Sequence, residues 1–139
     1  MRMENINKIN KLLDSSEKSV YPKIVDKHNR SFNYLRLAVN EYCNLRCIYC
    51  MPEEGLPLRN KNELLSTQEI KKLIKISAQL GVSKIRFTGG EPLLRKDISE
   101  LVKYAVNLDG IESVNLTTNG ILLNKYLKDL ELAGLTGIN

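Results

Sequence analysis

The sequence alternates between short apolar runs and longer amphipathic segments, and this alternation constrains the fold more than any other feature. Four segments are predicted to form β-strands or the beginning of one: residues 34–40, 84–90, 113–120 and 135–139. Three segments between them have the apolar spacing of helices: residues 65–81, 97–105 and 124–133. Such an order predicts a parallel sheet with crossover helices, either an open α/β sheet or a barrel.

Local signals support the helix ends. Ser66 and Glu69 are predicted to form a capping box at the start of the first helix, and Gly81 is predicted to end it. Asp97 and Glu100 are predicted to cap the second helix.

The N-terminal part differs from the rest of the chain. Residues 4–13 have helical apolar spacing, whereas residues 14–33 are polar and irregular. We therefore predict a helix and linker over residues 1–33 and one α/β domain over residues 34–139.

Composition narrows the class of protein. The 139 residues fit a single domain. The net charge of +5 comes from scattered basic residues without interleaved aromatic ones, so nucleic-acid binding is not expected, although a polyphosphate ligand would suit a mildly basic face. The apolar runs are too short to span a membrane and the N-terminus is too polar for a signal peptide, so we expect a cytoplasmic protein that binds no membrane.

All three cysteines lie within residues 41–55, EYCNLRCIYCMPEEG, where Cys43, Cys47 and Cys50 form the pattern C-x-x-x-C-x-x-C. In a reducing compartment, clustered thiols indicate metal or redox chemistry rather than disulfides. A structural zinc site needs four ligands, and His28, the single histidine, lacks the usual spacing. An iron–sulfur cube explains the number better, because three thiolates hold three irons and leave one iron open to a small molecule.

Three unusual stretches follow the predicted strands. The cysteine segment follows the first strand, TGGEP (88–92) the second and TTNG (117–120) the third. The carboxyl ends of parallel strands lie at one edge of a sheet or barrel, where ligands bind. We therefore predict that these stretches form one site.

Two arginines interrupt apolar strands. Arg36 and Arg86 would be costly as unpaired buried charges, so each is expected either to pair internally or to face an anion. A planar guanidinium suits a phosphate group or a purine edge.

The cysteine spacing, Tyr49 before the last cysteine and GGEP at 89–92 resemble the radical S-adenosylmethionine superfamily. Within it, YLRLAVNEYCNLRCIYCMPEEG, IRFTGGEPLLRKD and LTTNGILL resemble the GTP 3′,8-cyclase (MoaA) family of molybdenum cofactor biosynthesis. The resemblance implies a 4Fe-4S cluster whose open iron binds S-adenosylmethionine, reductive cleavage of that cofactor, and a radical that abstracts hydrogen from the substrate. It also implies a full or partial (β/α) barrel, consistent with the predicted element order.

The resemblance assigns roles residue by residue. The implied cluster ligands are Cys43, Cys47 and Cys50. The residues implied to contact S-adenosylmethionine are Tyr49, Gly89, Gly90 and Glu91. The residues implied to bind GTP are Arg36, Arg86 and Thr117. A reductant protein such as flavodoxin or ferredoxin is the implied electron donor.

Members of that family continue beyond the matched region and carry a second three-cysteine cluster. We therefore expect residues 34–139 to form about the first half of a radical SAM barrel, and the isolated chain to be inactive. Two alternatives stand beside this hypothesis. One is a radical SAM enzyme that acts on a peptide or another small molecule, and the other is a non-enzymatic metal-binding remnant.

Overall fold

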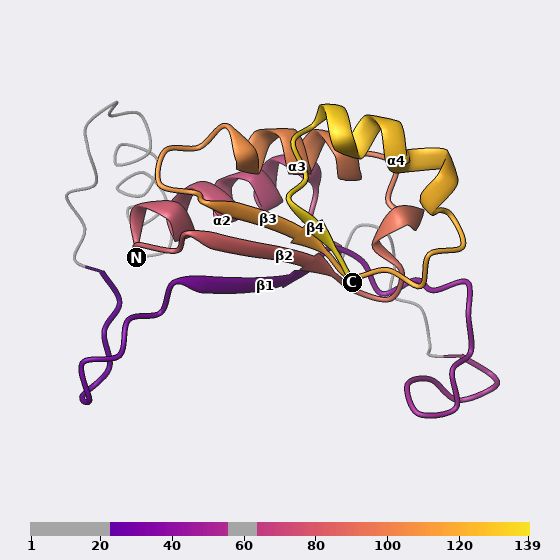
Figure 1. Cartoon of the computed structure of the whole chain (residues 1–139). Helices are drawn as coiled ribbons and strands as arrows, with labels where there is room; N and C mark the ends of the chain where they lie inside the picture. Colours follow the sequence, from indigo (N-terminus) through magenta and orange to yellow (C-terminus); the bar gives the residue numbers. More distant parts are fainter. Residues whose placement is uncertain (1–22, 56–63) are drawn as a thin grey trace, which may run out of the picture.

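A computed structural model describes residues 23–55 and 64–139 (Figure 1). The helix predicted at residues 4–13 lies outside these residues. The described elements, in chain order, are β1 (Tyr34–Ala38), α2 (Thr67–Gln79), β2 (Lys84–Thr88), the short 3-10 helix η2 (Pro92–Leu94), α3 (Ile98–Val106), β3 (Ser113–Leu116), α4 (Leu123–Leu132) and β4 (Gly137–Ile138). The predicted alternation of strands and helices is confirmed.

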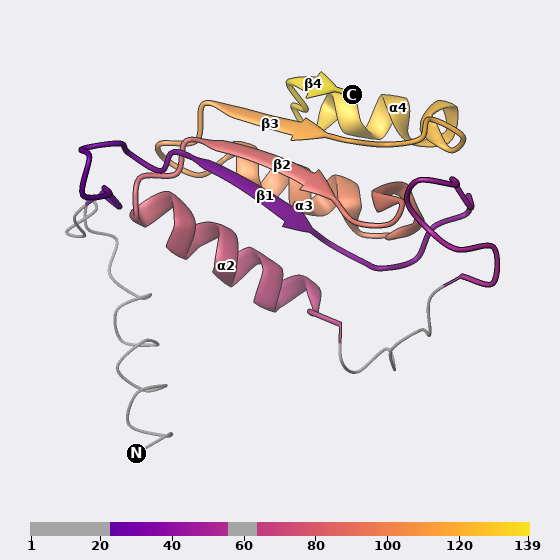
Figure 2. The same cartoon turned by 90° about the horizontal axis from the view of Figure 1, so that it is seen from below.

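The strands of the described part form one parallel sheet in the order β1-β2-β3-β4. Helices α2, α3 and α4 lie on one side of this sheet (Figure 1), and Figure 2 gives a second view of the layers. A doubly wound sheet would reverse its strand order and carry helices on both faces. Strands added in sequence beneath a single helical layer are instead typical of part of a (β/α) barrel.

The core lies between the sheet and the helices. Along β1, Leu37 and the following Val39 are buried while Arg36 is exposed, so the predicted alternation of faces is confirmed. Side chains from the strands and helices meet in one cluster that includes Ile70, Ile74, Ile85, Phe87, Ile98, Leu101, Val102, Val114, Leu116 and Leu130. Burial of this cluster fixes the sheet in register and leaves its opposite face uncovered by the described helices.

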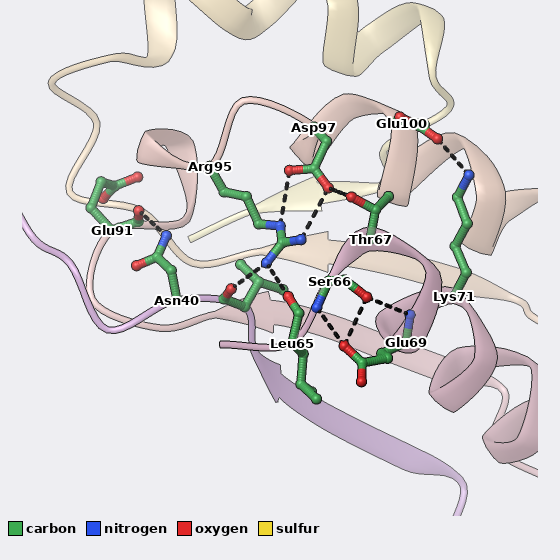
Figure 3. Close-up of polar contacts among 11 residues, drawn as sticks. Asn40, Leu65, Ser66, Thr67, Glu69, Lys71, Glu91, Arg95, Asp97 and Glu100 are labelled. Carbon is green, nitrogen blue, oxygen red and sulfur yellow. Dashed lines mark hydrogen bonds and ion pairs between the residues drawn. The ribbon is translucent and has the colours of Figure 1, made fainter. Parts of the chain in front are cut away.

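The start of α2 is capped as predicted. Ser66 Oγ accepts from the main-chain N–H of Glu69 at 3.3 Å, and Glu69 Oε2 accepts from the N–H of Ser66 at 2.8 Å (Figure 3).

The predicted capping of α3 by Asp97 and Glu100 is wrong. Asp97 occupies the N-cap position, but its carboxylate makes no capping bond. It accepts instead from Thr67 Oγ1 at 2.6 Å and from Arg95 Nε at 2.9 Å (Figure 3). Glu100 forms an ion pair with Lys71 of α2. Both carboxylates therefore connect α3 to its neighbours rather than close its own first turn.

Arg95 completes this connection. Its Nη1 donates to the carbonyl oxygens of Val39 at 2.9 Å and Leu65 at 3.0 Å, while Nε and Nη2 hold Asp97. The end of β1 and the starts of α2 and α3 are thus tied at one point.

Candidate active site

The loops that follow the first three strands lie against one another at the carboxyl ends of those strands. The N–H of Gly90, after β2, donates to the carbonyl oxygen of Asn40, after β1, at 3.0 Å. Asn119, after β3, donates from Nδ2 to Asn44 Oδ1 at 2.9 Å. The three unusual stretches of the sequence are therefore brought together, as their positions predict.

Gly89 and Gly90 leave no room for a side chain. A Cβ on Gly90 would lie 2.2 Å from the carbonyl oxygen of Tyr42, and a Cβ on Gly89 would lie 2.4 Å from that of Asn40. The N–H of Glu91 also donates to the carbonyl oxygen of Tyr42, at 2.6 Å. The close approach of two backbone segments thus explains both glycines, a reason that the sequence did not reveal.

The carboxylate of Glu91 is buried, with 1% of the residue exposed. Its Oε1 accepts from the N–H of Leu93 at 2.9 Å and from Thr118 Oγ1 at 2.7 Å, and its Oε2 accepts from the N–H of Asn119 at 2.8 Å. Its main-chain carbonyl accepts from Asn40 Nδ2 at 3.0 Å (Figure 3). A buried carboxylate needs such donors. The side chain of Glu91 thus connects the loops after β2 and β3, and its main chain connects them to the loop after β1.

The cysteines lie on a loop that extends from the carboxyl end of β1 (Figure 1). The N–H groups of Cys50 and Met51 donate to the carbonyl oxygen of Cys47 at 2.9 and 3.0 Å, which closes one helical turn. Residues three apart in such a turn face the same side, so Cys47 and Cys50 are neighbours. Cys43 and Cys47 are half-buried, Cys50 is exposed, and all three are free thiols.

Tyr49 is 93% exposed, so it is not a packed core residue. A charged Cys47 thiolate and a hydrogen bond to it are the main causes that raise the pKa of the Tyr49 hydroxyl above its usual value of 10.0. The ring therefore stands beside the thiols and is accessible to a ligand.

This donor set suits an iron–sulfur cluster better than a single metal ion. Within residues 23–55 and 64–139, no three Cys, His, Asp or Glu side chains gather as ligands of one ion. A cube does not require that, because each thiolate binds a different iron. His28 lies in the turn before β1, whereas the cysteines follow the other end of that strand, so it does not complete a zinc site with them in this fold.

Arg36 and Arg86 lie side by side, because β1 and β2 pair them in register. Both are on the face of the sheet away from the helices. Arg86 Nη1 donates to Thr117 Oγ1 at 3.3 Å and to Asn139 Oδ1 at 2.5 Å, while its buried Nε has no partner. Among the described residues neither arginine forms an ion pair. Arg36 is exposed, so the expectation that it is a buried charge is wrong.

A cleft of about 370 Å³ lies beside the first cysteine. It is lined by Glu41, Tyr42, Cys43, Asn44, Arg46, Met51, Glu54, Gly55 and Leu94. A cleft of this size accommodates a small molecule.

Three residues of the site had no role in the sequence analysis. They are Asn40, Thr118 and Asn119, which connect the loops through the hydrogen bonds described above. Their sequence signal is a polar side chain directly after a strand, a position that is common in any loop.

Comparison with known proteins identifies the relatives of the chain. The model of the radical SAM superfamily matches residues 37–139. The chain is 50% identical over 115 residues to a GTP 3′,8-cyclase of Thermodesulfovibrio yellowstonii, a match that covers 82% of this chain and 36% of that protein. It is 48% identical over 118 residues to the molybdenum cofactor biosynthesis protein moc-5 of Caenorhabditis elegans, covering 85% of this chain and 20% of that protein. The chain thus spans about a third or less of the length of these curated relatives.

Solved structures show the same fold. A crystal structure of BtrN in an open conformation matches 79% of this chain and 50% of that chain, with a TM-score of 0.62 and 26% identity. BtrN in complex with AdoMet and 2-DOIA matches 78% of this chain and 45% of that chain, with a TM-score of 0.64 and 26% identity.

Among the described helices, none has the length and apolar character needed to cross a membrane.

Proposed function

Because the chain belongs to the radical SAM superfamily, we propose that it holds a 4Fe-4S cluster for the cleavage of S-adenosylmethionine and serves the cyclisation of GTP in molybdenum cofactor biosynthesis. The cyclase relatives, 50% identical over the matched region, support this substrate. Since the chain spans about a third of those relatives, we assign to it the cluster loop and one wall of the substrate site.

Cys43, Cys47 and Cys50 would each bind one iron of the cluster. When bound and reduced, such a cluster supplies the electron that cleaves S-adenosylmethionine. The exposed ring of Tyr49 would contact this cofactor, and the backbone of Gly89 and Gly90 would lie beside it. The contact of Glu91 with this cofactor stays a prediction, and its buried carboxylate already accepts three hydrogen bonds from the protein.

The substrate proposal depends most on the two arginines paired in register. Like charges placed directly opposite each other across two strands destabilise a sheet. No described carboxylate forms an ion pair with Arg36 or Arg86, so an anionic ligand is the natural partner for them. Thr117 holds the Arg86 guanidinium in place and would line the same site. A triphosphate fits this charge better than a neutral ligand does.

GTP binding tests this proposal. We expect the full chain to bind GTP in equilibrium dialysis, and Arg36→Gln and Arg86→Gln each to weaken binding about tenfold or more, because each removes charged hydrogen-bond donors. Arg30→Gln is the matched control, since Arg30 is exposed in the turn before β1 and pairs with Asp26 there. Equal GTP affinity in all of these proteins would contradict the assignment. Preference for a peptide or an uncharged small molecule would favour the alternative of another radical SAM enzyme.

The proposed chemistry also implies a cellular compartment and an electron donor. Free thiols persist in the reducing cytoplasm, where a flavodoxin or ferredoxin could supply the electron. We propose that location and that class of partner for this chain.

A further inference from the structure

One contact between the loops has no part in the function proposed above. The side chain of Asn119, after β3, reaches the cysteine loop after β1. Its Nδ2 donates to Asn44 Oδ1 at 2.9 Å and lies 4.0 Å from the sulfur of Cys43. Asn44 is the residue next to Cys43, so this contact acts directly on the first cysteine of the motif.

The orientation of Asn119 is fixed by other bonds. Its Oδ1 accepts from the N–H of Ile121 at 3.1 Å, so the amide nitrogen must face the cysteine loop. Its own N–H donates to Glu91 Oε2 at 2.8 Å, which anchors its backbone to a buried carboxylate. The amide nitrogen of Asn119 is therefore held in position by one bond to its side chain and one to its main chain.

We propose that Asn119 is a positioning residue for Cys43, fixing the first thiol of the cysteine loop from the end of β3. The part of this inference that concerns the cluster depends on the proposed function, in which Cys43 is a cluster ligand. The hydrogen bond between Asn119 and Asn44 is itself a property of the chain without any cofactor. The N–H of Leu45, 3.4 Å from the same sulfur, is a second donor to the thiol. Two N–H donors facing one sulfur would raise the reduction potential of a cluster bound there, because they stabilise the added negative charge.

The first test measures how accessible the Cys43 thiol is in the chain without cofactor. Pulse labelling with iodoacetamide followed by trypsin separates the thiols, because Cys43 lies on the peptide 37–46 whereas Cys47 and Cys50 lie on the peptide 47–59. We expect Asn119→Ala to speed labelling of Cys43 by about two- to tenfold relative to the second peptide, the effect of losing one neutral hydrogen bond. Asn124→Ala, an exposed asparagine of α4, is the matched control and should change neither peptide.

A double-mutant cycle distinguishes the loss of the Asn119–Asn44 hydrogen bond from a general loss of structure. Asn44→Ala removes the acceptor of the same bond, so it should give a similar rise, and the Asn44/Asn119 double variant should add little to either single change. Additive effects of Asn44→Ala and Asn119→Ala, or an equal rise in both peptides, would overturn the inference.

A second readout uses the reconstituted protein. We expect the midpoint reduction potential of the cluster to fall in Asn119→Ala and to stay unchanged in Asn124→Ala. An unchanged potential in Asn119→Ala would overturn the proposed influence on the cluster. If the wild-type chain assembles no cluster, the proposed function fails, whereas the labelling experiment still decides whether Asn119 positions Cys43.

Discussion

The carboxyl ends of the strands are organised by a few residues with little freedom. Gly90 is the clearest, because a Cβ there would lie 2.2 Å from the carbonyl oxygen and 2.5 Å from the carbonyl carbon of Tyr42. Both atoms belong to the backbone, which cannot rotate away as a flexible side chain could. A side chain at this position must therefore push the GGEP loop away from the cysteine loop.

We predict that Gly90→Ala destabilises the protein by about 1 to 3 kcal/mol, the usual cost of overpacking, and loosens residues 40–44. Chemical denaturation gives the free energy of unfolding, and hydrogen–deuterium exchange locates the loosening. Gly110→Ala is the control, because that glycine has φ +86° but no atoms within 4 Å of the position of a Cβ. Faster exchange at residues 40–44 is expected in Gly90→Ala alone, and equal exchange in both variants would contradict the packing argument.

The GGEP motif also shows how far residue-level prediction reaches. The sequence predicts where Glu91 lies, at the carboxyl end of β2, and its resemblance to a known motif implies a contact with cofactor. The hydrogen bonds from Thr118 and Asn119, which are 27 and 28 residues further along, depend on how β2 and β3 pair. No local pattern in the sequence encodes that partnership, so the structural part played by this carboxylate could not be predicted.

Among the elements, the junction of β1, α2 and α3 depends on the ion pair of Arg95 with Asp97. Burial acts to raise the pKa of Asp97, but hydrogen bonds from Thr67 and Arg95 outweigh it, so the pKa lies below its usual value of about 3.8. A carboxyl group with a lowered folded-state pKa contributes stability above its unfolded pKa. That contribution is lost as the pH falls through the lowered value.

We predict that Asp97→Asn lowers the free energy of unfolding by about 1 to 3 kcal/mol at pH 7, because it removes a charged acceptor from three hydrogen bonds. The difference from the wild type should begin to shrink as the pH falls through about 3.8, the usual pKa that applies in the unfolded chain, and should be lost below the lowered pKa of the folded protein. Urea titrations at pH 7 and pH 3 measure it. Asp109→Asn, at an exposed position, should show no such difference at either pH, and a pH-independent gap for Asp97→Asn would count against the ion pair.

Helices and strands were the most predictable part of the chain. Periodicity located each described strand and long helix, and the capping box at Ser66 and Glu69 formed as predicted. The cap of α3 was predicted wrongly, because the carboxylate of Asp97 accepts from Thr67 and Arg95, which lie outside its own helix. Local capping rules do not account for such tertiary competition.

Taken as a whole molecule, the described chain has two unlike faces. The face beneath the helices is apolar and buried, whereas the opposite face carries Arg36 and Arg86 in register. The order of strands and helices alone could not choose between an open sheet and a barrel, because both share it, and only the family resemblance implied the barrel. The sequential strand order and the single helical layer decide for the barrel type.

The cysteine loop and the arginine pair lie close to the uncovered face of the sheet. The loop lies at the carboxyl ends of the strands. The arginines lie on the uncovered face, in the two strands β1 and β2. In a (β/α) barrel, ligands bind at the carboxyl ends of the strands, where the cysteine loop lies. We propose above that the cysteine loop binds a cluster with one iron left open to S-adenosylmethionine.

The decisive experiment is electron paramagnetic resonance of the anaerobically reconstituted and reduced chain, recorded with and without S-adenosylmethionine. We expect iron analysis of the same sample to give about four irons per chain, and the spectrum to change when S-adenosylmethionine is added, since a fourth iron lacks a cysteine ligand. A variant with Cys43→Ala, Cys47→Ala and Cys50→Ala combined should bind no cluster. Zinc in place of iron, or a spectrum that does not respond to S-adenosylmethionine, would mean that the loop holds no such cluster.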